Sequence, residues 1–343
     1  MKKDTLKYIA KELNISVSTV SRALNNKNIV KEETRKKVLE LADKYSYTPN
    51  EVARSLRKSS TDTIAIVLPD ISETFFGNVV NEIDKEISDK GYMILLADTH
   101  EEKEKEQKYL DMLYKRRVDA LVLATVDFEC SEVQRFLDND VPVVFIDNIP
   151  NIKNINLVVT DNKKASRMAV EYLHSQGHRD IAAIIGSEKE STGLERLNGY
   201  VMIQKELKMK PNANLVKYGD FKYMSGKECM NELLKNRDKH FFSAVYITSE
   251  KMTHGAVDAI LESGLKIPED ISVVGFDVHD YNQRSSLKIT SIKQKEEEIG
   301  EKVGKLLLKC LTSKKKEEAL ISENIVLEPY IEYGGSVKKF VGR

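Results

Sequence analysis

Several residue types are scarce in this chain of 343 residues. The three cysteines, Cys130, Cys229 and Cys310, are far apart and odd in number, so we expect free thiols and neither a disulfide framework nor a CxxC zinc site. There is no run of about 18 apolar residues, the length that a membrane-spanning helix needs. The polar start of the chain lacks the apolar segment of a secretory signal. These absences predict a cytoplasmic protein that has no contact with a membrane.

Net charge is absent as well, because 54 Lys and Arg residues balance 54 Asp and Glu residues. A neutral chain is not a typical nucleic-acid binder, since such proteins are usually basic. The charges are unevenly distributed, however. Residues 1–60 contain 14 basic and seven acidic residues, a net charge of +7, and residues 61–343 contain 40 and 47, a net charge of −7. This asymmetry suggests a nucleic-acid-binding module joined to an acidic body, although a solvated charged surface is the simpler alternative.

The first part of the chain has the pattern of two short helices joined by a tight turn. Thr5 can cap a helix whose apolar residues recur at helical spacing up to position 13. Asn14 suits the positive φ of a tight turn, and Ser16 can cap a second helix. Small Ala10 permits close crossing of the helices, and Val20 holds the second helix against the first. These features indicate a helix-turn-helix.

The second helix has a small polar face that could enter a DNA major groove. Arg22 is suited to a bidentate contact with guanine, and the hydroxyl groups suit phosphates or bases. An ordinary helical hairpin with a solvated hydroxyl-rich face is the alternative. A third helix, from Glu32 to about Tyr45, completes the predicted domain, with Tyr45 in its apolar stripe. The residues predicted to contact DNA in this domain are Thr5, Ser16, Val17, Ser18, Thr19, Ser21, Arg22 and Asn25.

The segment after these helices carries a specific resemblance. The strings TLKYIAKELNISVSTVSRALN at 5–25 and YTPNEVARSLRKSS at 47–60 closely resemble the lactose/galactose/purine repressor family of bacterial transcription factors. The resemblance implies that residues 49–60 include a hinge helix that enters the minor groove of operator DNA, where Leu56 wedges into a base step and kinks the duplex. A plain linker helix is the alternative. The hinge residues implied to contact DNA are Asn50, Ala53, Arg54, Leu56 and Arg57.

From residue 61 onward, apolar runs alternate with helical segments. Such alternation is typical of doubly wound parallel sheets covered on both faces, and the length favours two α/β lobes with a cleft between them. The resemblance extends over this body and implies a periplasmic-binding-protein-like core behind an all-α head. We therefore expect a head at 1–48, a hinge at 49–60 and an effector-binding and dimerisation domain at 61–343. Its N-lobe would comprise about 61–161 and 293–320, and its C-lobe about 162–290 and 322–343, with crossovers near 161–162, 289–293 and 320–324.

The resemblance also implies a small-molecule effector between the lobes, at the carboxyl ends of the strands. Carboxylates would accept hydrogen bonds from hydroxyl groups, and an arginine would donate two hydrogen bonds in the plane of its guanidinium group. Other roles remain open: Asp161 and Glu250 could cap helices, and Phe75 and Phe76 could belong to the core. The residues matched to the effector site are Ser72, Phe75, Phe76, Asp147, Asp161, Thr192, Arg196, Phe221, Ser249, Glu250, Asp277 and Gln294.

Together these patterns predict a homodimeric transcriptional regulator, most simply a repressor of a carbohydrate-utilisation operon, that binds pseudo-palindromic operator DNA and a sugar or sugar derivative. Glu190 stands where the purine repressor has a base-binding arginine, which disfavours a nucleobase effector. A nucleobase-responsive repressor and a global catabolite regulator with a phosphorylated carrier protein as corepressor are the alternatives within the family. A transporter's solute-binding protein and a sugar-processing enzyme are the alternatives outside it.

The enzyme alternative lacks sequence support, because no GxGxxG follows the first strand and neither a Walker nor a GxSxG motif occurs. His174 and His178 have metal-binding spacing, but no third ligand is apparent nearby, and a histidine at a helix C-terminus suits the helix dipole. We therefore expect neither a cofactor nor a metal.

Overall fold

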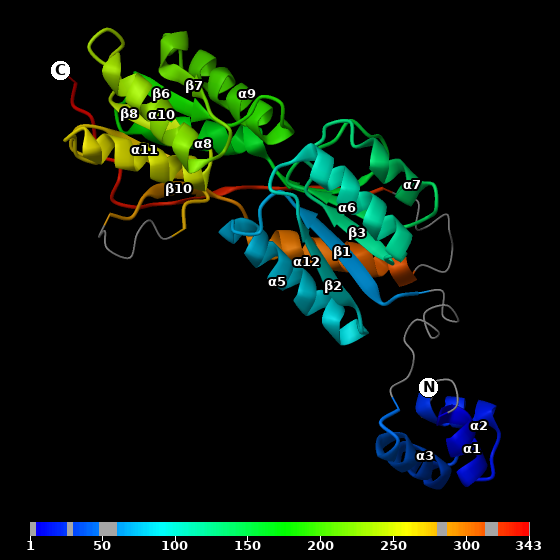
Figure 1. The fold of residues 1–343 in the computed structure, drawn as a ribbon. Coiled ribbons are helices and arrows are strands. Elements are labelled where there is room, and N and C mark those ends of the chain that lie inside the picture. The colour runs from blue at the N-terminus through cyan, green and yellow to red at the C-terminus, as the bar shows by residue number, and fades with distance from the viewer. Residues whose placement is uncertain (1–4, 26–29, 48–59, 280–286, 313–321, 343) are drawn as a thin grey trace. The chain divides into compact units, whose positions relative to one another are not determined.

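The computed structural model describes residues 5–25, 30–47, 60–279, 287–312 and 322–342. Their contacts divide the chain into two compact units, residues 1–61 and residues 62–343. The first unit is the head, and the second is a two-lobed α/β body (Figure 1). The predicted fold class is therefore confirmed.

The head consists of three helices, α1 (Thr5–Glu12), α2 (Val17–Asn25) and α3 (Glu32–Lys44). They enclose a small core in which Ile9, Val20 and Val38 are fully buried and Ala10 is nearly so. Two details differ from the sequence prediction. Thr5 lies in the first turn of α1 instead of preceding it, and Tyr45 is 42% exposed. Its hydroxyl donates to Glu12, which explains why it leaves the apolar stripe.

Each lobe of the body contains a six-stranded sheet. The N-lobe sheet has the order β11-β5-β4-β3-β1-β2, and the C-lobe sheet has the order β12-β10-β9-β8-β6-β7. Described strand pairs are parallel except β10 with β12, which is antiparallel. The N-lobe strands are β1 (Thr63–Leu68), β2 (Met93–Asp98), β3 (Ala120–Leu123), β4 (Val143–Ile146), β5 (Asn156–Thr160) and β11 (Asn324–Leu327). The C-lobe strands are β6 (Ile181–Ile185), β7 (Val216–Tyr218), β8 (Ala244–Ile247), β9 (Ser272–Phe276), β10 (Thr290–Lys293) and β12 (Tyr330–Glu332).

Helices cover both faces of each sheet because alternate residues of the buried strands point to opposite sides. In the N-lobe, α5 and α12 pack on one face and α6 and α7 on the other; in the C-lobe, α10 and α11 lie opposite α8 and α9 (Figure 1). The helices are α5 (Thr74–Ile87), α6 (Lys103–Arg116), α7 (Gln134–Leu137), α8 (Asn162–Ser175), α9 (Ser191–Glu206), α10 (Tyr223–Lys235), α11 (Glu250–Glu262) and α12 (Glu296–Thr312). Short 3-10 segments are η1 (Ser88–Lys90), η2 (Ser131–Val133) and η3 (Ala213–Leu215).

The part of the chain that the structure describes passes between the lobes three times. The first passage, between β5 and α8, lies at the predicted position. The second follows β10, because this strand pairs with β9 inside the C-lobe sheet, so the predicted 289–293 is a few residues early. The third was predicted at 320–324 and lies after Leu327, since β11 pairs in parallel with β5. Residues 324–327 therefore belong to the N-lobe and not, as expected, to the C-lobe.

Candidate functional site

The head has the local geometry that its sequence predicted. Asn14 has a φ of 53° at the turn between α1 and α2. The Ser16 hydroxyl accepts a hydrogen bond from the Thr19 backbone N–H at 3.0 Å and so caps α2. The same hydroxyl is bonded to those of Ser18, at 2.7 Å, and Thr19, at 2.8 Å. The first turn of α2 therefore displays a linked row of hydroxyl groups.

The remaining predicted DNA contacts are distributed around this row. Ser16, Val17, Ser18 and Arg22 are exposed, whereas Thr5, Thr19 and Ser21 are half-buried. Asn25 ends α2, and its side chain lies outside the described part of the structure. The predicted hinge contacts Asn50, Ala53, Arg54, Leu56 and Arg57 also lie outside it. The exposed face of α2 thus consists of small, mostly polar side chains and one long cationic side chain, that of Arg22.

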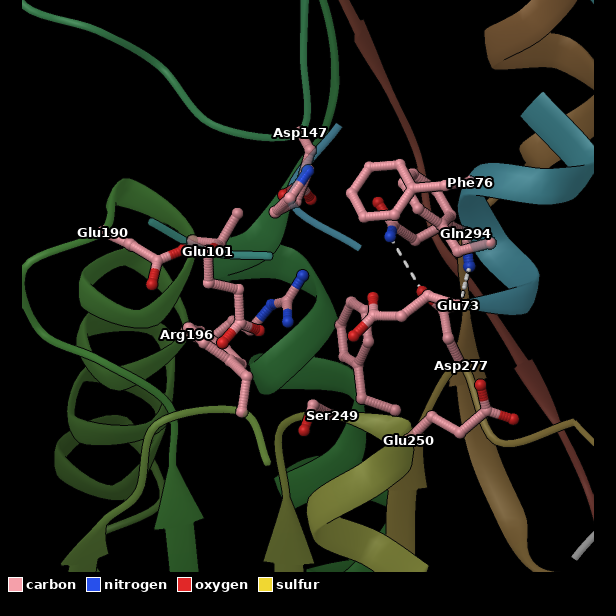
Figure 2. A pocket seen from close by; sticks show the side chains of 15 residues that line it. Glu73, Phe76, Glu101, Asp147, Glu190, Arg196, Ser249, Glu250, Asp277 and Gln294 are labelled. Atoms are coloured by element: carbon pink, nitrogen blue, oxygen red, sulfur yellow. Dashed lines mark hydrogen bonds between the residues drawn. The ribbon is translucent and has the colours of Figure 1, made fainter. Parts of the chain in front are cut away.

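A pocket lies between the two lobes of the body, at the carboxyl ends of their strands (Figure 2). Its empty volume is about 620 Å³, which includes the part open to solvent. The segments that form it follow β1, β2 and β4 in the N-lobe and β6, β7, β8, β9 and β10 in the C-lobe. This is the edge where open parallel sheets bind ligands.

Ten of the twelve residues matched to an effector site line this one pocket. They are Phe75, Phe76, Asp147, Thr192, Arg196, Phe221, Ser249, Glu250, Asp277 and Gln294. Ser72 and Asp161 do not line it. Asp161 instead caps α8, accepting from the Lys164 backbone N–H at 2.8 Å. Ser72 is exposed, and its backbone N–H donates to Asp70, so it shapes the loop before α5.

Five lining residues were not predicted as pocket residues. They are Pro69, Glu73, Glu101, Glu190 and Phe276. Glu190 had a sequence signal, since it replaces an arginine of the family pattern. The other two glutamates stand beside helix starts, where acidic residues are common for dipole reasons alone. Glu73 and Glu101 line the pocket because the two lobes lie close together there.

Arg196 is the only basic side chain among the residues lining the pocket, and it is 5% exposed. Its Nε donates to Asn162 Oδ1 at 2.7 Å and its Nη1 to the Thr248 carbonyl at 2.8 Å. Its guanidinium lies 3.7 Å from the centre of the Phe276 ring. These contacts hold it rigidly, and its Nη2 makes no hydrogen bond with the described residues. The group is therefore positioned to donate to a ligand.

Aromatic rings supply the apolar part of the pocket. Phe75 and Phe76 are both buried, belong to the N-lobe core and pack edge to face with ring centres 5.0 Å apart, so the core and pocket roles coincide. On the C-lobe side, the Phe221 ring rests against Gly186. A Cβ at Gly186 would lie 2.0 Å from that ring, so glycine is required for Phe221 to stay in place.

Asp277 and Gln294 form a fixed acceptor pair. Both Asp277 oxygens accept from Gln294, one from the backbone N–H and one from the side-chain amide, each at 2.8 Å. Burial raises the pKa of Asp277 to about 6, although these hydrogen bonds oppose the rise. Near neutral pH the carboxylate is ionised and oriented, ready to accept from a ligand hydroxyl.

Charged side chains join the lobes around the pocket. Lys251 of α11 pairs with Asp70, and Lys222 lies 3.1 Å from Glu101. On another side, His279 lies 3.0 Å from Glu296 at the start of α12, and its backbone N–H donates to Glu250 at 2.8 Å. Glu250 therefore anchors the His279 loop, whereas the helix cap of α11 is Ser249.

Stability should fall as pH rises through the neutral range. Burial raises the pKa of Glu73 to about 8 and that of Glu190 to about 7, so the folded state holds protons that the unfolded state releases above pH 4.5. Ion-pair contacts with Glu250 and Glu296 raise the pKa of His279 to about 9. The stabilisation that they provide is complete below about pH 6.5 and is lost as the pH rises through about 9.

We therefore expect the melting temperature of the unliganded chain to drop by a few degrees between about pH 7 and about pH 8.5, and Glu73→Gln to reduce the drop. Differential scanning calorimetry measures it, with exposed Glu104→Gln as the control that keeps the wild-type slope. A melting temperature that rises over this interval contradicts the assignment.

Comparison with known proteins identifies the family to which the chain belongs. Residues 61–328 match the family of periplasmic binding proteins and the sugar binding domain of the LacI family, and residues 5–50 match the bacterial regulatory proteins of the lacI family. The chain belongs to the LacI family of DNA-binding transcriptional repressors. Members of this family are regulators and not enzymes, as the sequence predicted.

The sequence of this LacI-family repressor is similar to those of its relatives over nearly the whole chain. It is 32% identical over 318 residues to the transcriptional repressor PurR of Histophilus somni (strain 129Pt), covering 92% of this chain and 95% of that protein. It is 32% identical over 307 residues to CytR of Escherichia coli (strain K12), covering 89% of each. Among solved structures, the CelR–cellobiose complex is 28% identical, with a TM-score of 0.73, over 96% of this chain and 99% of that one. In the described residues, no helix is long and apolar enough to span a membrane.

Proposed function

We propose that this repressor controls a carbohydrate-utilisation operon in the cytoplasm, in response to an unphosphorylated sugar or sugar derivative bound between its lobes. The pocket's composition is the observation that carries the proposal. Six carboxylates line it beside a single arginine, and four phenylalanine rings form its apolar walls. Carboxylates accept from hydroxyl groups, and ring faces pack against the C–H faces of a sugar. The similarity to a regulator solved with cellobiose supports the same ligand class.

The pocket disfavours a phosphorylated sugar as well as the two alternatives within the family. A sugar phosphate would place a dianion among carboxylates that have one arginine to balance them, which like-charge repulsion opposes. A flat nucleobase would need a donor at position 190, where this chain has a glutamate. The global catabolite alternative requires no particular pocket chemistry, and a pocket as elaborate as this one is more simply explained by a small ligand.

A thermal-shift screen of the full chain tests the ligand class. The panel contains neutral and derivatised monosaccharides and disaccharides, sugar phosphates, and nucleobases with their nucleosides. A ligand at 100 times its Kd stabilises the folded state by about 2.7 kcal/mol, which is a readily measured shift. We expect stabilisation by members of the unphosphorylated sugar group. Stabilisation by nucleobases or by sugar phosphates alone would overturn the proposal.

We further propose that two copies of the chain bind pseudo-palindromic operator DNA, with one α2 in each major-groove half-site. The accessible hydroxyl row, Arg22 and the +7 charge of residues 1–60 support this arrangement. The hinge contacts predicted at 50–57 would lie at the operator's centre, where paired helices enter the minor groove. Whether the effector releases or promotes operator binding follows from which lobe arrangement it favours.

Replacing Arg22 with alanine should weaken operator binding about 10- to 100-fold, because a bidentate base contact is worth about 1–3 kcal/mol. Fluorescence anisotropy with a selected operator duplex measures the loss. Exposed Arg117→Ala in the body is the matched control and should bind as the wild type does. Equal weakening on random-sequence DNA would show that Arg22 contacts only phosphates.

A further inference from the structure

Four carboxylates gather at one side of the pocket, each from a different segment. Glu73 precedes α5, Glu101 follows β2, Asp147 follows β4, and Glu190 precedes α9. All four line the same pocket, and the charges of Asp147 and Glu101 add to the larger effect of burial in raising the pKa values of Glu73 and Glu190. Glu101, Glu190 and Asp147 are among the side chains labelled around the pocket in Figure 2, and the charge of Arg196 acts on both Asp147 and Glu190.

The positive charges nearby do not balance this group. Lys222 pairs with Glu101, and Lys251 lies 3.7 Å from Glu73 while it also pairs with Asp70. Glu190 accepts one neutral hydrogen bond, from the Asn148 side chain at 3.1 Å. The Asp147 carboxylate makes no hydrogen bond or ion pair with any described residue. Two acidic groups thus face the pocket without a cation of their own in ion-pair contact.

Arg196 does not neutralise them, because its contacts lie elsewhere. Its Nε and Nη1 are bonded to Asn162 and to the Thr248 carbonyl, and its plane stacks on Phe276. Its charge lowers the pKa of Asp147, but burial outweighs that effect and leaves the pKa raised. Asp147 and Glu190 therefore face the pocket without a cation in ion-pair contact, and a positive group placed there would favour their ionised forms.

Thr192 independently indicates that a polar ligand group belongs at this place. The residue is 3% exposed, stands in the first turn of α9 two positions after Glu190, and lines the pocket. Its hydroxyl makes no hydrogen bond with the described residues. Because Thr192 lines the pocket, a polar group of the ligand can bond this hydroxyl in place of solvent.

We propose that the effector carries a protonated amino group, as an amino sugar does, and that Asp147 and Glu190 bind this ammonium while Thr192 bonds a neighbouring hydroxyl. The inference rests on the proposed sugar effector and adds its charge. A cation beside these buried carboxylates favours their ionised forms, so ligand binding and ionisation of the carboxylates are coupled. Phe75, Phe76 and Phe221 remain free to pack on the sugar ring.

Three matched probes separate charge from size in a calorimetric titration of the full chain. They are D-glucosamine, D-glucose and N-acetyl-D-glucosamine, and the galactose and mannose series are run in the same way. Glucose has the ring without nitrogen, and the acetylated probe has the nitrogen without its charge. In the series that binds, the amino sugar should bind at least about tenfold more tightly than both neutral probes.

Two variants test which residues cause the preference for the amino sugar over the neutral probes. Glu190→Gln should reduce it about tenfold or more, and Asp147→Asn should do the same, while exposed Glu188→Gln should leave it unchanged. Circular dichroism and operator binding confirm that each variant is folded. Amino-sugar binding that survives both variants unchanged overturns the assignment of these two residues.

The outcomes distinguish this inference from the proposed function on which it rests. If neutral or acetylated probes bind as tightly as the amino sugars, the ammonium site is wrong and the sugar effector stands. If no sugar of any series binds and a nucleobase or a sugar phosphate does, both are wrong.

Discussion

Replacing Arg196 with alanine should abolish the response to effector and leave operator binding intact. The variant removes the only basic group that lines the pocket, which is held by Asn162 and the Thr248 carbonyl and is poised to donate through Nη2. A charged donor in a buried site contributes several kcal/mol, so we expect an affinity loss of about 100-fold or more. Titration calorimetry with the strongest ligand from the screen measures the loss.

The controls for this variant address folding. Arg196→Ala leaves Asn162 and the Thr248 carbonyl without their donor, which costs about 1–3 kcal/mol of stability, so its melting temperature is measured alongside. Arg167→Ala removes a half-buried arginine of α8 that pairs with Glu206, and it should bind effector normally. Effector affinity that stays within about threefold of wild type in Arg196→Ala would contradict the pocket assignment.

Operator affinity should fall about 1,000-fold or more when monovalent salt rises from about 50 to about 200 mM. The charge division of the chain is the reason: residues 1–60 have a net charge of +7 and the remainder −7. Two heads that together contact about 6–10 phosphates release a corresponding number of counterions, which sets the steep slope. Binding measured by anisotropy across this range gives the slope directly.

The salt dependence of effector binding should differ from that of operator binding. Effector binding to the pocket is short-range and largely shielded from solvent ions, so its salt dependence should be much shallower than that of operator binding. A salt slope near zero for the operator would mean that the head does not bind phosphates, and the charge asymmetry would then be only a feature of the solvated surface.

The head could be predicted closely from the sequence because local chemistry determines it. Asn14 takes the positive φ that the turn needs, and Ser16 caps α2, both within a few residues of the positions that they control. Tyr45 shows the limit of such reasoning. Its spacing is that of the apolar stripe, but a hydrogen bond to Glu12, 33 residues away, draws it to the surface.

The pocket was predictable in part, chiefly through the family resemblance. Residues at strand ends and helix starts, such as Phe221 and Asp277, have the sequence contexts that the resemblance matched, and they do line the cavity. Asp161 has the same kind of context, yet its carboxylate caps α8. Which role an aspartate at a strand end takes depends on the direction of the next helix, which the residues themselves do not specify.

Glu73, Glu101 and Glu190 were missed as pocket residues because their burial is a property of two lobes together. In each lobe alone, a glutamate beside a helix start would be solvated. The strand β11 was missed for a related reason. It is short and largely exposed, and its place in the N-lobe depends on pairing with β5, far away in the sequence.

The central claim is that a small ligand in the pocket controls the affinity of the head for DNA. It is tested most directly by titrating the full chain into a labelled operator duplex, selected from random DNA, at fixed salt with and without the saturating sugar from the thermal-shift screen. We predict a change in operator Kd of about tenfold or more, which is the usual size of coupling between two linked sites. A sugar that saturates the pocket and leaves the operator Kd unchanged would contradict the claim.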